Sequence, residues 1–266
     1  MNGSFSVGEV LSTSLRIWIR NFFTFTLLAA VLYVPVVLYT HDSDVYLGER
    51  DGVYTFLLIR YAGGWFFLPN LLTALIAYGV IMALRGRHAT FLGSLTNGVR
   101  RSLPAMLVAV LMFALILLVW IVILLPSGMA QSLALLYVLM FVSGAVVLSL
   151  YCRWYLAVAS SVLERPGIAG AFGRSRELTF GQKGAIFGMI FLVVAAKIGL
   201  GLLIGHQFPN DSYQEILEYA RIQQLTLVGF DVLVSPLFAT LPVVTYFALR
   251  REKEGIAADD LAQVFE

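Results

Sequence analysis

Charged residues are scarce in this chain, and that scarcity excludes an ordinary water-soluble protein. They make up 13% of the 266 residues, whereas hydrophobic residues make up 59%. Soluble domains carry about 25% charged residues. No hydrophilic stretch is long enough for a separate soluble catalytic domain, which needs about 50 residues or more. We therefore expect a single integral membrane domain that covers residues 1–266.

The residues and motifs of common active sites are also missing. Cys152 is the only cysteine, which excludes an intramolecular disulfide and a cysteine-based metal site. The three histidines, His41, His88 and His206, lie far apart and lack metal-ligand spacing. No glycine-rich loop precedes a Lys-Ser or Lys-Thr pair, so nucleotide hydrolysis is not expected. We expect no catalytic residue, cofactor or metal, and the protein is not predicted to be an enzyme.

Long apolar runs are what the chain has in abundance. Six of them are long enough to cross a hydrocarbon layer of about 30 Å as a helix. They cover residues 22–39, 65–84, 103–125, 133–152, 185–204 and 225–249. The fold class predicted is therefore all-α, a polytopic membrane protein with six transmembrane helices. In the fifth run, Gly184 and Gly188 have small-xxx-small spacing, which predicts close packing against another helix.

The positive charges fall mainly on one side of these runs. Lys and Arg near span ends are retained in the cytoplasm, whereas acidic residues contribute little to orientation. On the predicted inner side lie Arg16, Arg20, Arg85, Arg87, Arg100, Arg101, Arg153, Arg165, Arg174, Arg176, Lys183, Arg250, Arg251 and Lys253. The opposite side has only Arg50, Arg60 and Arg221. This alternation predicts that both termini are cytoplasmic.

Three segments on the predicted cytoplasmic side have the pattern of amphipathic helices lying on the membrane surface. They cover residues 6–20, 90–101 and 167–180, and the second is expected to end before the helix-breaking Pro104. Each precedes a pair of apolar runs, which suggests a threefold internal repeat of an interfacial helix and a hairpin. Similar connectors can also arise without a repeat, because any hairpin needs one.

Several short motifs resemble a known family. They are the opening Phe5-Ser-Val-Gly-Glu-Val-Leu, the stretch from Leu163-Glu164-Arg165-Pro166-Gly167 to Gly181, and Tyr246 to Leu249 with Arg250, Glu254 and Gly255. Together they resemble the bacterial six-span family named for the membrane domain of glycerophosphoryl diester phosphodiesterase. The resemblance covers nearly the whole chain and implies a fold and a bacterial inner-membrane location. It implies no activity, because the catalytic part of such fusions is a separate soluble barrel.

Two charges inside the apolar runs are the strongest candidates for a site. Lys197 and Asp231 both fall in the predicted outer half of the membrane, where a lone charge costs a few kcal/mol or more. Asn70 is predicted at a similar depth, so the three could form an intramembrane polar cluster. The alternative is a lysine that reaches the interface and an acid wetted there, each without the other.

A second candidate is a rim of cations that could gather anionic lipid headgroups. It comprises Arg85, Arg87, Arg100, Arg101, Arg174, Arg176 and Lys183. Inner-membrane proteins carry such an excess for topological reasons alone. The expected partners are membrane lipids, anionic ones included, and a protein of a membrane complex. Nucleic acid is not expected.

Two functions remain open. The first is a non-enzymatic inner-membrane accessory or scaffold protein that associates with lipid or a larger complex. The second is a small transporter or permease subunit that uses the outer-half polar cluster. A cavity lined by Lys197, Asp231 and Asn70 would favour transport, and a tightly filled bundle would favour the scaffold. The sequence favours the scaffold, because a carrier should show more polar residues deep in its spans.

Overall fold

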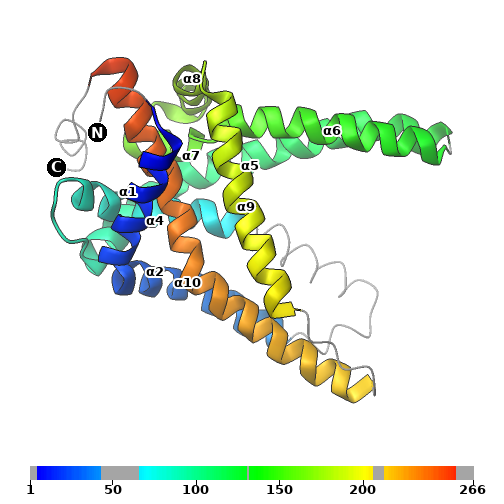
Figure 1. The fold of residues 1–266 in the computed structure, drawn as a ribbon, viewed down its shortest axis with the longest axis horizontal. Helices are drawn as coiled ribbons and strands as arrows, with labels where there is room; N and C mark the ends of the chain where they lie inside the picture. The colour runs from blue at the N-terminus through cyan, green and yellow to red at the C-terminus, as the bar shows by residue number, and fades with distance from the viewer. Residues whose placement is uncertain (1–4, 43–65, 131, 206–212, 256–266) are drawn as a thin grey trace.

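The computed structural model describes residues 5–42, 66–130, 132–205 and 213–255, and helices are the only regular elements in these ranges (Figure 1). They are α1 (Val7–Arg20), α2 (Phe22–Asp42), α4 (Leu68–Leu84), α5 (Phe91–Ala130), α6 (Leu133–Trp154), α7 (Ala157–Leu163), α8 (Gly167–Thr179), α9 (Lys183–Gly205) and α10 (Tyr213–Glu254).

Several of these helices have the length and composition of membrane spans. Three stretches are long and apolar enough by themselves: Phe91–Pro126, Leu133–Leu163 and Gly229–Glu254. The count rises to five if each of two bent pairs, α1 with α2 and α8 with α9, is taken as one span. The all-helical class is confirmed, and these helices are compatible with insertion in a membrane. Six spans and the threefold repeat stay predictions.

The second predicted interfacial helix does not end where expected. We placed its end before Pro104, but α5 continues through Pro104 and Pro126 to Ala130. A proline removes one backbone hydrogen bond and bends a helix, and a long apolar helix can accommodate this without ending. The segment 90–101 is therefore continuous with the following apolar run rather than a separate element.

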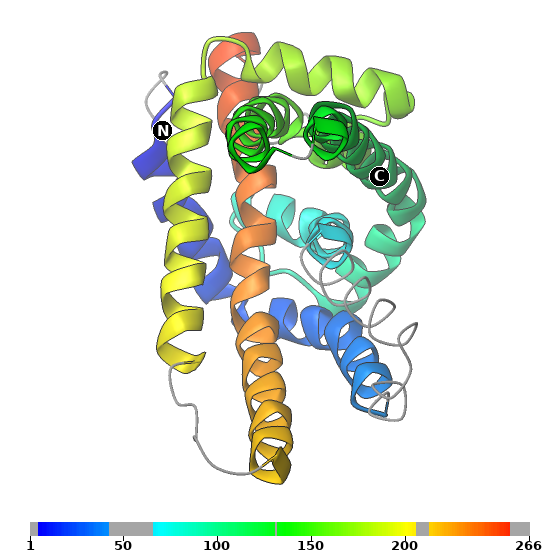
Figure 2. The ribbon, with the colours of Figure 1, turned by 90° about the vertical axis from the view of Figure 1, so that its right-hand side faces the viewer.

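An elbow of 85° separates α1 from α2, and Asn21 holds it in place. The Asn21 side chain is buried, donates from Nδ2 to the Ile17 carbonyl at 3.0 Å and accepts from the Ala89 amide at 2.9 Å. Arg20 donates to the Gly86 carbonyl at 2.6 Å. The elbow is thus fixed to the loop between α4 and α5. The bend between α8 and α9 is 100°, and Figure 2 shows α8 lying crosswise at the end where α10 finishes.

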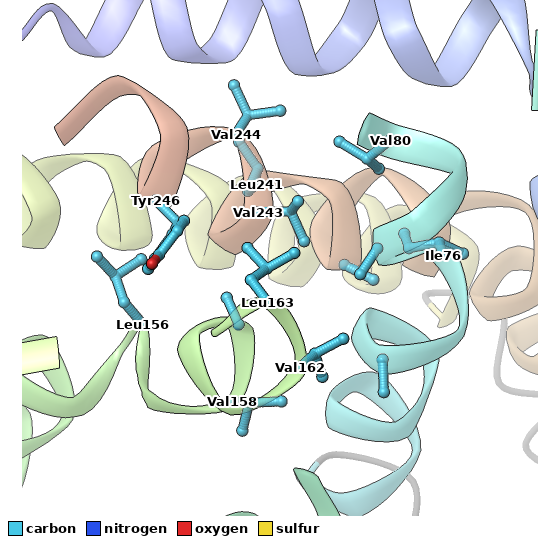
Figure 3. Close-up of a cluster of buried hydrophobic side chains, with 14 of the residues drawn as sticks. Ile76, Val80, Leu156, Val158, Val162, Leu163, Leu241, Val243, Val244 and Tyr246 are labelled. Atoms are coloured by element: carbon cyan, nitrogen blue, oxygen red, sulfur yellow. The ribbon is translucent and has the colours of Figure 1, made fainter. Parts of the chain in front are cut away.

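The apolar core lies where α4, α7 and α10 meet (Figure 3). All seven residues of α7 are buried, although the sequence predicted no helix there. Leu163 of α7 and Leu156, the residue just before this helix, pack in one cluster with side chains of α10 and α4, among them Tyr246 and Ile76. The short helix is apolar with small residues, so neighbouring helices can surround it on all sides.

Close helix packing is found at α4 and α5 rather than along α9. A Cβ atom added at Gly98 of α5 would lie 2.5 Å from Leu75 Cα of α4. At Gly184 and Gly188 of α9 such an atom would meet nothing within 4 Å. The packing predicted from the glycine spacing in α9 is therefore not seen at these two positions among the described residues.

The α5–α6 hairpin extends away from the core as an arm, which Figure 2 views nearly end-on. Its apolar side chains are largely exposed, for example Ile121 at 54% and Phe141 at 81%. Such a surface needs lipid or another protein to cover it. Several predicted outer-side charges, among them Arg50 and Arg60, lie outside the described residues.

Candidate functional site

Lys197 of α9 and Asp231 of α10 form an ion pair. Lys197 Nζ lies 2.7 Å from Asp231 Oδ1, and the two side chains are 16% and 29% exposed. The ammonium group also lies 5.7 Å from the centre of the Phe238 ring, within the range of a cation–π contact. The sequence left open whether these two charges meet, and the structure brings them together. Pairing lowers the cost of holding either charge among apolar helices.

A cavity of about 170 Å³ adjoins this pair. Its walls come from four helices, and Lys197 contributes the only charged side chain among the lining residues. The other lining residues are Phe66, Pro69, Asn70, Thr73, Tyr151, Tyr155, Met189, Ile190, Val193, Val194, Phe238, Ala239, Leu241 and Pro242. The volume corresponds to about six water molecules at about 30 Å³ each. One cation in a largely apolar wall suits an anionic group that carries an apolar part.

Asn70, the third member of the predicted polar cluster, lines the same cavity as Lys197. Its Nδ2 atom donates to the Phe66 carbonyl at 2.6 Å, at the start of α4. The amide therefore stabilises the first turn of α4 while its side chain borders the cavity. Asp231 is not among the lining residues and contributes through Lys197.

The predicted cationic rim is divided by the structure into engaged and exposed residues. Arg101 is 4% exposed and donates from Nη1 to the Val162 carbonyl at 2.8 Å, which ties α5 to α7. Arg174 forms ion pairs with the carboxylates of Glu164 and Glu254. Exposed members are Arg87, Arg100, Arg176 and Lys183, and Arg85 is partly buried. Two of the seven residues thus stabilise the fold directly, and the rim is not one continuous basic surface.

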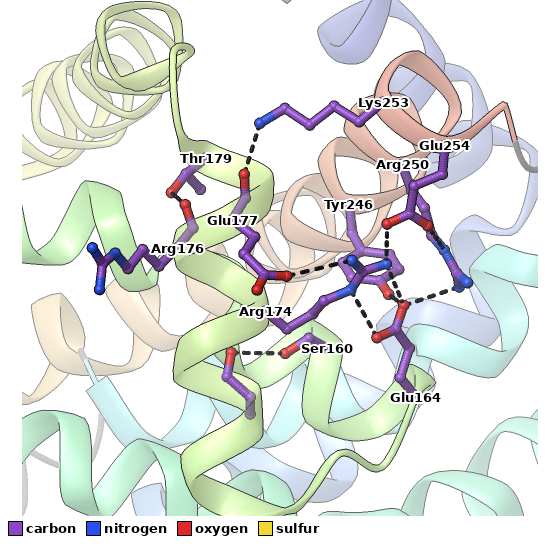
Figure 4. Close-up of polar contacts among 11 residues, drawn as sticks. Ser160, Glu164, Arg174, Arg176, Glu177, Thr179, Tyr246, Arg250, Lys253 and Glu254 are labelled. Carbon is purple, nitrogen blue, oxygen red and sulfur yellow. Dashed lines mark hydrogen bonds and ion pairs between the residues drawn. The ribbon is translucent and has the colours of Figure 1, made fainter.

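Sequence reasoning missed an ion network at the junction of α7, α8 and α10 (Figure 4). Glu164 accepts hydrogen bonds from Arg174 Nε at 2.9 Å and from the Tyr246 hydroxyl, and its carboxylate forms an ion pair with Arg250 Nη1 at 3.0 Å. Glu254 pairs with Arg250 at 2.8 Å and also contacts Arg174. All five residues belong to the motifs that carry the family resemblance. Four of the five are charged, which was the available signal, but the sequence did not show that they meet.

This junction network, defined as Glu164, Arg174, Tyr246, Arg250 and Glu254, shifts the protonation of its members. Burial opposes the charge on Arg174, but hydrogen bonds to Glu164 and Glu254 outweigh it and raise the pKa of Arg174. Burial would raise the pKa of Glu254, but hydrogen bonds from Arg250 and Arg174 lower it overall. Both charges are therefore stabilised by the folded state, and the network has a structural role.

In the described ranges, no group of three or more His, Cys, Asp or Glu residues could hold a metal ion. Comparisons with protein-family models, curated proteins and solved structures find no match for this chain. The resemblance to the six-span membrane-domain family therefore stays a prediction.

Proposed function

We propose that the protein is a small membrane transporter or permease subunit that binds an anion with an apolar part in the cavity beside Lys197. The observation that carries this proposal is the Lys197–Asp231 pair at the edge of a cavity that Asn70 also lines. It departs from the scaffold that the sequence favoured, because a tightly filled bundle would leave no such cavity.

The ion pair allows Lys197 to exchange Asp231 for an anionic ligand. Without a ligand, Asp231 neutralises Lys197. An anionic ligand in the cavity competes with Asp231 for the ammonium group, and the displaced carboxylate then needs water or a proton. Binding of the anion is thereby coupled to the charge state of Asp231. The apolar walls, among them Val193 and Phe238, hold the rest of the ligand.

Binding is tested with 1-octanesulfonate as the probe and 1-octanol as a control of equal chain length without charge. The purified protein in detergent should be stabilised by octanesulfonate more than by octanol. The Lys197→Gln/Asp231→Asn double variant removes both charges and leaves no unpaired one, so it should fold and lose that difference. Efflux of octanesulfonate from proteoliposomes should be faster with the natural sequence than with the double variant. Equal responses of the two proteins in both assays would reject the proposal.

A second candidate function rests on the α5–α6 arm. An accessory subunit of a membrane complex would use such a surface to contact its partner. In the most apolar part of the stretch Leu133–Leu163, only 6% of the residues are buried within the chain. Native mass spectrometry from mild detergent tests this by detecting a protein subunit bound in fixed stoichiometry. Substituting the exposed Phe141 by Ser should release that subunit, whereas a lipid-facing arm would show none.

A further inference from the structure

A second cavity lies between α5, α7 and the start of α8. Its volume is about 290 Å³, and it is separate from the cavity beside Lys197 because the two share no lining residue. The wall consists of Arg100, Pro104, Val108, Ser161, Arg165, Gly167 and Ile168. It therefore combines two cations with an apolar floor.

Among the described residues, no carboxylate lies within ion-pair distance of Arg100 or Arg165. Glu164 is adjacent to Arg165 in the chain, but its carboxylate is held by Arg174 and Arg250. Both cavity arginines are exposed, so a ligand can reach them. An arginine pair facing one cavity is suited to the oxygens of a phosphate group.

The unusual backbone conformation of Arg165 supports a role of this residue in ligand binding. Arg165 has φ of 55°, and it is the one non-glycine residue with a positive φ in the described ranges. Residues other than glycine rarely adopt this left-handed backbone conformation, because it brings their Cβ atom close to a carbonyl oxygen of the backbone. Arg165 precedes Pro166, the N-cap of α8, and the first residues of this helix, Gly167 and Ile168, also line the cavity. The N-terminus of α8 has no side-chain cap, so its first amides add to the positive field.

The surroundings of the cavity indicate a lipid rather than a free ion. Along α5, Leu103 and Leu107 follow Arg100 at helical spacing and are 69% and 45% exposed. Ile168 on α8 is also exposed. An amphiphile with its phosphate at the arginines could lay its chains along this apolar stripe, as expected at the boundary between headgroups and acyl chains.

We propose that this cavity binds the phosphate of an anionic membrane phospholipid, with Arg100 and Arg165 as its ligands. The site uses fewer residues than the cationic rim expected from the sequence. It adds Arg165, which that rim did not include, and it does not use Arg101 or Arg174, which have protein partners. The proposal is independent of the transport function proposed above.

The experiment measures binding of dioctanoyl-phosphatidylglycerol to the full chain in a neutral detergent by microscale thermophoresis. Arg165→Gly removes the charge and also relieves the positive φ, so the variant should fold at least as well as the natural sequence. It should bind about tenfold more weakly, since a hydrogen bond to a charged group is worth about one decade or more in affinity. Arg165→Lys retains the charge and should lose less.

Arg176→Gln is the matched control, because Arg176 is an exposed arginine of α8 that does not line the cavity. This variant should change the affinity less than twofold. An equal loss in Arg176→Gln and Arg165→Gly would show that general surface charge is responsible and would overturn the site. Unchanged binding in Arg165→Gly would do the same.

Inorganic phosphate and the zwitterionic dioctanoyl-phosphatidylcholine distinguish the sources of the phosphate. Neither should compete efficiently with the anionic lipid. Inorganic phosphate that binds as tightly as the lipid would overturn the lipid assignment. The Lys197→Gln/Asp231→Asn variant should bind the lipid normally, so failure of the transport proposal and failure of this one give different results.

Discussion

Replacing Glu164 by glutamine should destabilise the protein more than any other single change in the junction network. Glu164 accepts hydrogen bonds from Arg174 and Tyr246 and forms an ion pair with Arg250, and its side chain is 18% exposed. Removing one partner of a fully buried ion pair costs about 3–5 kcal/mol. Partial solvent access and the remaining amide oxygen reduce this, so we expect a loss of about 2 kcal/mol. For a chain of this size that lowers Tm by about 4–8 °C.

Cys152 provides the assay. It is the only cysteine and is 3% exposed, so a thiol-reactive fluorophore reports its exposure on heating. Glu177→Gln is the control, because its carboxylate lies 3.8 Å from Arg174 and its side chain is 73% exposed. We expect a change in Tm of about 1 °C from that surface pair. Equal Tm shifts in the two variants would refute the conclusion that Glu164 holds the junction together.

Two further predictions concern helix packing and pH. Gly98→Ala should destabilise the protein by about 1–3 kcal/mol, because the added Cβ atom would lie 2.5 Å from Leu75 Cα. Gly144→Ala is the control: its Cβ atom would meet nothing within 4 Å, so the change should be neutral or stabilise by up to about 1 kcal/mol. Thermal melts of both variants measure this, and equal effects would contradict it. Since the folded pKa of Glu254 is lowered, its stabilising contribution is present above the unfolded value of about 4.3 and is lost as pH falls below it. The Tm difference between the natural sequence and Glu254→Gln, followed by tryptophan fluorescence, should therefore shrink between pH 6 and pH 3.5, and a constant difference would contradict this.

Helices were predictable because their signals are local. Apolar runs of about twenty residues have one low-energy conformation in lipid, the helix. The predicted runs 133–152 and 185–204 begin and end within about two residues of α6 and α9. The helix α7 was missed because Ala157–Leu163 is short and lies between a predicted span and a polar motif. Its burial depends on α4 and α10, which approach it from distant parts of the chain.

The candidate site was predictable in its residue types but not in its contacts. The cost of a charge among apolar residues singled out Lys197 and Asp231. Their separation in the sequence could not show whether α9 and α10 place them together. The junction network shows the reverse case, since Glu164 and Arg250 are charges near helix ends, where solvation is the usual expectation. Only the crossing of α7, α8 and α10 brings them within 3.0 Å.

The helix α10 connects the junction network with the cavity. Arg250 and Glu254 are fixed at its C-terminal end, and Asp231 lies about 28 Å earlier along the helix. Pro236 and Pro242 lie between them, and Pro242 lines the cavity. Each proline removes a backbone hydrogen bond, so a bend of α10 is easiest at these positions. Such a bend would change the Lys197–Asp231 distance while the junction network stays intact, which is the separation of moving and fixed parts that a carrier requires.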